Sequence, residues 1–456
     1  MQRNIIMRLS HFCFSLILIF SLCNSITLKA QTRRDTLPPV ATLQECLRYA
    51  IKNQPLLRQA VIDQEITERT IGIALSAWLP QISATGNYQH YFQLPSSPIF
   101  NTATNSTVVT QLGVNNTSAL GLGASQTIYN NDVLLASRGA RFSRQFSRQN
   151  TENTQIEVVA NVSKAFYNLL LSQKQLQIID ENIIRLRRAL KDAYQQYQAG
   201  VVDKIDYKQA TISLNNELSA RKQTQETIKA NIATLKELMG NADNRTINPV
   251  YDSLALSREI AVDTNVVVNP TNRIEYQQLE TTRSLQNLNV SYYRYGYLPT
   301  IGAFGNYNLS YLNNQLSKLY GQSYPNAYAG LNISIPIFQG TRRLQNLRRA
   351  KLIVDRADLD LVNSRNVINT EYVTALANYK SNYTELITQR ENVNLANEVY
   401  NVVFLQYREG IKTYLDVIVA QSDLRTSQIN YNNALFTVLS SKIDLQKALG
   451  SLPVNY

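Results

Sequence analysis

The longest stretch without a charged residue is the feature that most constrains the fold of this chain. From Thr70 to Asn131 the sequence has no Lys, Arg, Asp or Glu, although these residues make up 17% of the chain. A second such stretch runs from Tyr295 to Thr341 and is interrupted only by Lys318. A sheet that meets water on one face normally carries charge on that face. The two stretches therefore predict strands in a hydrocarbon environment rather than hairpins of a soluble β-sandwich.

Apolar and small polar residues alternate through both stretches, which is the period of a β-strand. The clearest run places branched apolar residues at every second position: Leu331, Ile333, Ile335 and Ile337. Each run is about ten residues long, the length that a tilted strand needs to cross a bilayer. We expect two hairpins, 81–129 and 299–338, whose apolar faces contact lipid. Aromatic residues mark the expected strand ends, where a membrane-interface girdle belongs: Trp78, Tyr129, Tyr297 and Phe338.

The first 30 residues have the pattern of a signal peptide. Arg3 and Arg8 precede an apolar run, and Ala30 offers a small-residue cleavage site. Cys23 raises the alternative of a lipidated N-terminus, but the three residues before it form a poor lipidation signal. Export together with membrane strands predicts a location in the outer membrane.

The sequence lacks the constellations that are typical of enzymes and metal sites. Of the two histidines, His11 lies in the leader and His90 in a predicted strand. Cys46 is the single cysteine after the leader, which excludes an intrachain disulfide framework or a zinc site. The net charge of +12 is spread along helices and interleaved with acids, which disfavours nucleic-acid binding. We expect neither catalysis nor a cofactor or metal.

Glycines mark a tandem repeat along the chain. Gly200 and Gly410 each end a long helical pattern and lie 210 residues apart, as do Gly240 and Gly450. Each repeat is predicted to contain a helix, a β-hairpin and a long helix pair. The first repeat is longer in its hairpin, because a polar loop is predicted between the two strands, at 94–117.

The repeats give the predicted domain organisation. After the signal peptide, 1–30, the first repeat spans 31–240 and the second spans 270–456. A linker with short elements joins them at 241–269, where Asn-Pro occurs twice and no strong period is present.

Helix lengths predict how the helices are arranged. The helix at 131–197 is roughly 100 Å long and needs lateral partners. The helices at 203–240 and 270–297 together nearly match its length, so we expect these two to stack end to end. Four strands cannot close a barrel, and an open sheet edge is not tolerated in lipid. The chain must therefore oligomerise, and a trimer with twelve strands above a tube of helices is a simple closure.

The order and spacing of these features resemble the TolC family of outer-membrane channel-tunnels, over essentially all of the mature sequence. The matching motifs are Leu79-Pro80 and Leu298-Pro299, Ile335-Pro336-Ile337-Phe338, Tyr197-Gln198-Ala199-Gly200 with Asp206, Tyr407-Arg408-Glu409-Gly410 with Asp416, and Ala448-Leu449-Gly450. The resemblance implies a mixed α and β membrane protein that forms a homotrimer. Long helices would form a coiled-coil α-barrel in the periplasm, and four strands per chain would complete a transmembrane β-barrel.

The resemblance also implies a function and partners. Family members serve as the exit duct of tripartite efflux pumps or type I secretion systems, for small molecules or polypeptides. The implied partners are outer-membrane lipid, a periplasmic adaptor protein and an inner-membrane pump of the RND, ABC or MFS type. The alternative from a different class is a surface or periplasmic coiled-coil scaffold or adhesion protein without a channel.

Two sets of candidate site residues follow from the resemblance. The helix tips that would contact an adaptor are Gly200, Val201, Gly410 and Ile411. The residues that would close the periplasmic aperture are Asp206, Tyr407, Lys412 and Asp416. A plainer reading stands beside each: glycine ends helices in the left-handed conformation, and Thr413-x-x-Asp416 is a capping-box pattern.

Overall fold

The computed structural model describes residues 40–102, 105–241, 248–250, 260–454 and 456. The described residues belong to one compact unit. The predicted signal peptide, 1–30, and much of the predicted linker lie outside the described residues. No helix among the described residues is both long enough and apolar enough to cross a membrane.

Long helices make up most of the described chain. The first half contains α2 (Leu43–Asn53), α3 (Pro55–Leu75), α4 (Asn131–Gln198) and α5 (Lys204–Met239), and the second contains α7 (Ile274–Arg294), α8 (Arg342–Arg408) and α9 (Tyr414–Leu449). Short 3₁₀ turns are η1 (Ser76–Trp78), η2 (Pro270–Asn272) and η3 (Leu316–Gly321). The predicted ends of the two longest helices, 197 and 407, each differ by one residue from the ends of α4 and α8.

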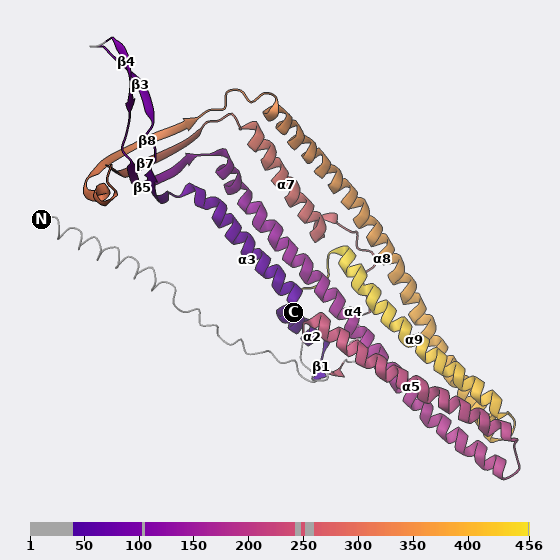
Figure 1. Cartoon of the computed structure of the whole chain (residues 1–456). Coiled ribbons are helices and arrows are strands. Elements are labelled where there is room, and N and C mark those ends of the chain that lie inside the picture. Colours follow the sequence, from indigo (N-terminus) through magenta and orange to yellow (C-terminus); the bar gives the residue numbers. More distant parts are fainter. Residues whose placement is uncertain (1–39, 103–104, 242–247, 251–259, 455) are drawn as a thin grey trace. The chain divides into compact units, whose positions relative to one another are not determined.

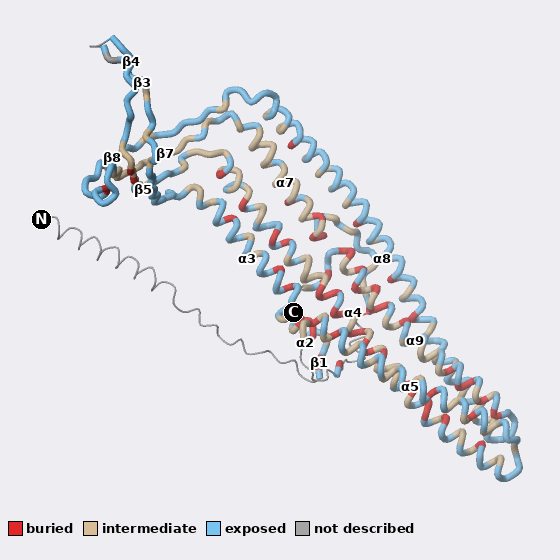
Figure 2. The backbone as a smooth tube through the Cα atoms, viewed as in Figure 1, coloured by how far each residue is buried: buried red, intermediate tan, exposed pale blue. Residues whose placement is uncertain are grey.

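The helices pack side by side in a layer. Helix α4 contacts α3, α5, α7 and α9, and α8 contacts α7 and α9. Their order is therefore α3–α4–α7–α8 near the sheet and α5–α4–α9–α8 farther from it (Figure 1). Buried residues gather along α4 and α9, whereas most of α8 and the sheet is exposed (Figure 2). The outer helices of this layer are thus α3 and α5 at one side and α8 at the other.

Helix α5 ends against the start of α3, at a contact that we call the first junction. Gly240 ends α5 with a φ of 68°, and a Cβ at this position would lie 2.6 Å from the carbonyl oxygen of Asn53. The buried Gln54 side chain donates a hydrogen bond to the Leu238 carbonyl oxygen at 2.8 Å. Helix α2 packs on α3, α4 and α5 beside this contact, through its buried residues Cys46, Leu47 and Ala50.

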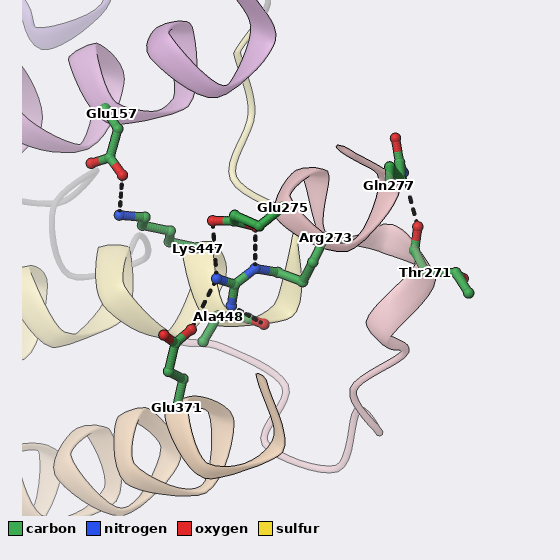
Figure 3. A network of polar contacts seen from close by, with 8 residues as sticks. All are labelled: Glu157, Thr271, Arg273, Glu275, Gln277, Glu371, Lys447 and Ala448. Carbon is green, nitrogen blue, oxygen red and sulfur yellow. Dashed lines mark hydrogen bonds and ion pairs between the residues drawn. The ribbon is translucent and has the colours of Figure 1, made fainter. Parts of the chain in front are cut away.

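Helix α9 ends against the start of α7 in the same way, at the second junction (Figure 3). Gly450 also has a φ of 68°, and a Cβ there would lie 2.8 Å from the Asn272 carbonyl oxygen. The Arg273 side chain, only 7% exposed, donates a hydrogen bond to the Ala448 carbonyl oxygen at 3.2 Å. Arg273 therefore does at the second junction what Gln54 does at the first.

Arg273 also connects α7 to α8 through charge. Its Nε donates to Glu275 at 3.0 Å, and its Nη2 donates to Glu371 of α8 at 2.9 Å (Figure 3). Burial raises the pKa of the Glu275 carboxyl, but the hydrogen bond and the charge of Arg273 outweigh it and hold that pKa below its ordinary value. Lys447 of α9 and Glu157 of α4 form a further ion pair nearby, at 2.6 Å.

Shorter helices do stack end to end as predicted, but the prediction named the wrong pair of helices. We expected the helix at 203–240 to stack on the helix at 270–297, which correspond to α5 and α7. Instead α5 stacks on α3 and α9 stacks on α7. Length could not decide between these arrangements, because α3 and α7 both have 21 residues.

The predicted strand pairs form one antiparallel sheet. It consists of β2 (Gln81–His90), β5 (Asn116–Tyr129), β7 (Thr300–Asn313) and β8 (Ser323–Ser334), in the order β2-β5-β7-β8. Edge strand β2 follows α3 in the chain, and edge strand β8 leads into α8. The sheet and the helix layer are therefore open at the same two edges.

Two details of the strand prediction were wrong. Strand β8 ends at Ser334, so Ile335 and Ile337 lie beyond it; Pro336 has no N–H to continue the ladder. The predicted loop at 94–117 contains a hairpin of β3 (Ser96–Asn101) and β4 (Ser106–Gln111). Outside these sheets, β1 (Val40–Ala41) pairs in parallel with β6 (Asn248–Pro249).

The register gives the main sheet two unlike faces. Leu122 lies beside Ala84 on one neighbouring strand and Tyr307 on the other. One position further, Gly123 lies beside Ser83 and Asn306. We call the first face the apolar face; its large residues are Ile82, Tyr88, Leu120, Leu122, Ile301, Tyr307, Leu309, Tyr311, Leu331 and Ile333. The second is the polar face, which carries mainly Ser, Thr, Asn, Gln and Gly.

Candidate functional site

The apolar face of the sheet has the chemistry of a lipid-facing wall. Ile82 is 79% exposed and Leu331 is 65% exposed, with no charged neighbour in the strands. Such a continuous apolar surface is unfavourable in water and is the normal exterior of a membrane strand. Ile333 shares this face with Leu331, whereas Asn332 and Ser334 lie on the polar face, as the alternation predicted.

The four predicted interface aromatics all lie at the sheet end that joins the helices. Trp78 ends η1, Tyr129 ends β5, Tyr297 precedes β7 and Phe338 follows β8. Phe338 is 86% exposed, and the guanidinium of Arg343 lies 5.0 Å from the ring centroid of Tyr297. Exposed rings with a neighbouring cation suit the boundary between hydrocarbon and water.

A polar cluster marks the opposite end of the apolar face. The buried amide oxygen of Asn116 accepts a hydrogen bond from the Tyr88 hydroxyl at 2.8 Å and lies 2.7 Å from His90 Nδ1. The Asn116 amide nitrogen donates to the carbonyl oxygens of Asn313 and Asn314. His90, which sequence reasoning left without a role, thus lies at this polar boundary.

The helix tips end in left-handed glycines, as capping predicts. Gly200 has a φ of 71° and Gly410 a φ of 74°, and a Cβ at either would meet no atom within 4 Å. Backbone conformation rather than space therefore demands glycine at these positions. The side chains that follow, Val201 and Ile411, are 74% and 72% exposed. Together the four residues present an apolar surface at the end of the helix layer farthest from the sheet (Figure 1).

The candidate aperture residues lie just behind these tips. The Tyr407 hydroxyl of α8 donates a hydrogen bond to Gln196 Oε1 of α4 at 3.0 Å. Asp206 lies in the first turn of α5, and Tyr407 uses its hydroxyl on Gln196 rather than on this carboxylate. The Lys412 Nζ lies 3.8 Å from Asp416 Oδ1, within the same α8–α9 hairpin. A single protomer thus brings Tyr407 to Gln196 and Lys412 to Asp416.

Asp416 forms the predicted capping box at the start of α9. Its Oδ2 accepts hydrogen bonds from the Thr413 backbone N–H at 2.9 Å and from the Thr413 hydroxyl at 2.8 Å. These bonds hold the pKa of Asp416 below its ordinary value. The capping role of Asp416 is therefore present in the protomer, whatever further role the residue has.

Sequence reasoning missed the polar contacts that join the two helix hairpins above the tip. Gln421 of α9 donates to Asn182 of α4 at 2.6 Å, and Arg425 of α9 pairs with Glu217 of α5 at 2.8 Å. Glu217 and Asn182 are buried. Gln196 was missed as well, although the 210-residue spacing makes it the equivalent of Gln406 in the second repeat.

Comparison with known proteins identifies the family. The family model described as "Outer membrane efflux protein" matches residues 46–241 and 272–451. The chain belongs to the outer membrane efflux protein family. The outer membrane protein TolC of Vibrio cholerae is 20% identical over 416 residues, which cover 90% of this chain and 91% of that protein. The probable efflux pump outer membrane protein TtgC of Pseudomonas putida is 22% identical, over 90% of this chain and 82% of that protein.

Solved structures share the fold. The open state of the Neisseria gonorrhoeae MtrE outer membrane channel matches with a TM-score of 0.69 at 18% identity, over 93% of this chain and 95% of that one. The Campylobacter jejuni CmeC outer membrane channel matches with a TM-score of 0.68 at 19% identity, over 90% of this chain and 85% of that one. Membership of the family makes the protein an outer-membrane exit duct for efflux, in agreement with the apolar face of its sheet.

Proposed function

We propose that three copies of the chain close into one duct across the outer membrane and the periplasm. The observation that carries this proposal is the coincidence of open edges. Strand β2 and helix α3 form one edge of the protomer, and strand β8 and helix α8 form the other. An unpaired strand edge is not tolerated in lipid, so edge β8 of one copy pairs with edge β2 of the next.

The exposed surface of α8 supports the same closure. Apolar side chains that are more than half exposed recur along the length of this helix: Leu352, Leu359, Val373, Ile387, Val399 and Leu405. Burial of such a stripe against a neighbouring helix is the usual source of stability in helix bundles. A cyclic trimer brings α8 of one copy beside α3 and α5 of the next and covers the stripe.

The duct would serve as the exit of a tripartite efflux pump or a type I secretion system. The helices extend into the periplasm, and the tips at Gly200, Val201, Gly410 and Ile411 contact a periplasmic adaptor protein. An inner-membrane pump of the RND, ABC or MFS type supplies the energy. The interface aromatics Trp78, Tyr129, Tyr297 and Phe338 fix the depth of the sheet in outer-membrane lipid.

The aperture at the periplasmic end would be held by the residues behind the tips. The Tyr407–Gln196 hydrogen bond joins the two hairpins of one protomer at 3.0 Å. Asp206 and Lys412 would form contacts between copies, with Lys412 exchanging its 3.8 Å pairing with Asp416 for a neighbouring copy. Asp416 would be repeated three times around the axis. Ion pairs of this kind stabilise a closed tip to the extent that the neighbouring copies shield them from water.

Single-channel recording in planar bilayers tests the duct and its aperture. The parent protein should run as a heat-labile trimer in detergent and conduct ions in small steps. Tyr407→Phe combined with Lys412→Ser should increase the conductance while the trimer persists. A trimer that does not conduct would favour the scaffold alternative, and an unchanged conductance in the double variant would contradict the aperture role.

A pair of adjacent substitutions tests the two faces of β8. Arg at Ala327, which lies on the apolar face beside Tyr307 in the middle of the sheet, places charge in lipid and should cost about 2–4 kcal/mol, so that little folded protein reaches the outer membrane. Arg at the adjacent Asn326 lies on the polar face, and this variant should assemble and change ion selectivity. Equal assembly of both variants would contradict the membrane assignment of the apolar face.

A further inference from the structure

The polar face of the sheet, which lines the lumen in the proposed duct, carries no formal charge. Its side chains are short hydroxyls and amides, for example Ser83, Thr85, Asn306, Asn308, Asn326 and Asn332. A wall of this kind offers hydrogen bonds without favouring cations or anions. It therefore suits the passage of neutral solutes better than that of ions.

Amides on this face lie flat against the sheet. A Cβ placed on Gly121 would lie 2.6 Å from the Asn308 amide oxygen, and one placed on Gly123 would lie 3.0 Å from the Asn306 amide oxygen. The two amides thus occupy the space that side chains at the two glycines would fill. As a result, the wall is shallow across β5 and β7.

Four large residues interrupt this face: Leu312 and Tyr324 lie toward its far end, and Phe304 and Tyr328 lie together nearer the helices. Their rings meet edge to face, with centroids 6.2 Å apart and an interplanar angle of 75°. Phe304 covers Gly330, since a Cβ there would lie 3.0 Å from the Phe304 ring. This packing explains Phe304 but not Tyr328, which is 52% exposed beside Asn306.

Closure of the barrel would leave the aromatic pair open to the lumen. Strand β2 of the next copy would adjoin β8 with polar side chains that carry no ring on this face, such as Ser83 and Thr85. Twelve strands with a spacing of about 4.8 Å and a tilt of about 40° give a barrel radius of about 12 Å. Three aromatic pairs at one level around such a radius narrow the lumen substantially.

We propose that Phe304 and Tyr328 form a lumenal site that binds neutral, planar organic molecules on their way out. The proposal rests on the trimeric duct and names the substrate class that its barrel selects. An aromatic edge-to-face pair offers ring faces for stacking, and the neighbouring amides of Asn306 and Asn326 offer hydrogen bonds. The absence of charge on this face leaves stacking as the main source of selectivity.

Block of single channels by N-acetyl-tryptophanamide, a neutral soluble aromatic, tests the proposal. The parent channel should show concentration-dependent block by this probe and much less block by N-acetyl-leucinamide. Phe304→Leu combined with Tyr328→Leu should raise the half-blocking concentration on the order of tenfold. Tyr328→Phe keeps the ring and should retain the block. Tyr307→Leu is the matched control, because Tyr307 lies on the apolar face of the same strand as Phe304.

The outcomes separate this site from the duct itself. A conducting parent channel that ignores the aromatic probe overturns the aromatic site and leaves the duct standing. Equal block of the parent and of the double variant also overturns it, as does loss of block in Tyr307→Leu. A parent protein that forms no trimer and no channel overturns the duct and the site together.

Discussion

The two helix junctions share one backbone design but are completed by different chemistry. In both, a helix ends in a glycine with a left-handed backbone, Gly240 or Gly450. A side chain at the start of the stacked helix donates a hydrogen bond to the carbonyl oxygen two residues before that glycine. At the first junction the donor is the neutral Gln54, and helix α2 packs beside it. At the second junction the donor is Arg273, which has two carboxylate partners.

This difference shows which part of the design is needed and which part is adaptable. The glycine and the carbonyl contact recur because, at both junctions, one helix must end directly against the start of another that comes earlier in the chain. Leu79-Pro80 and Leu298-Pro299 lie 219 residues apart, and this spacing makes Leu56 the equivalent of Glu275. The 210-residue spacing of the glycines makes Asn161 the equivalent of Glu371. At the first junction the apolar residues of α2 pack against the contact. At the second junction ion pairs of Arg273 serve instead, and the pair with Glu371 connects the junction to α8.

Substitution of the junction glycines should have the largest effect. Gly240→Ala and Gly450→Ala combine a left-handed backbone with a Cβ 2.6 Å and 2.8 Å from a carbonyl oxygen. We expect each to lower the free energy of unfolding by about 2–4 kcal/mol, with Gly240→Ala the worse. Thermal unfolding in detergent measures the effect.

Gly410→Ala is the control for this pair. It has the same positive φ but no atom within 4 Å of the added Cβ, so only the backbone cost of about 1–2 kcal/mol remains. Equal losses in all three variants would show that the close approach at the junctions has no energetic weight.

Neutralising the second junction should have the next largest effect. Arg273→Gln copies the first junction but leaves Glu275 and Glu371 without their cation, so we expect a loss of about 2 kcal/mol. Gln54→Ala at the first junction removes one neutral hydrogen bond and should cost about 1 kcal/mol. Chemical unfolding of both variants measures the difference.

Removal of the two carboxylates provides the matching control. The triple variant Arg273→Gln, Glu275→Leu, Glu371→Asn reproduces the chemistry of the first repeat and should recover part of the lost stability. A triple variant that is less stable than Arg273→Gln alone would mean that these carboxylates stabilise the junction without the arginine.

Acid should weaken the second junction and leave the first unchanged. The pKa of Glu275 is held below its ordinary value of 4.5, so its contribution is complete above that value. It is lost as the pH falls below that value and the carboxylate becomes protonated. Gln54 does not titrate. The stability difference between the parent and Arg273→Gln should therefore shrink below about pH 4.5, and a constant difference would contradict the ionic account.

The helices and strands could be predicted from the sequence because their signals are local. Two-residue alternation located β2, β5, β7 and β8, and glycines located the ends of α4 and α8. The predicted end of the last strand was wrong, although Pro336 is present in the sequence and could have marked it. The apolar pattern continued through it to Ile337, and we followed the pattern rather than the missing N–H.

Contacts between distant segments could not be predicted in this way. Helix lengths could not show whether α3 or α7 stacks end to end on α5. Nothing in a helical period indicates that Gln196 meets Tyr407, or that Arg273 meets the end of α9. Such pairs depend on which helices pack side by side or end to end, and the sequence pattern of a single helix does not encode this.

Closure by three copies is the central claim, and cross-linking of the two sheet edges tests it most directly. Ser83→Cys on β2 and Asn332→Cys on β8 place thiols on the polar face of opposite edges, and the native Cys46 is fully buried. A flexible bis-maleimide should convert the outer-membrane protein into covalent dimers and trimers and no larger species, whereas either single variant should give at most dimers. Products that stop at the monomer, or a ladder that continues beyond three copies, would contradict the trimeric duct.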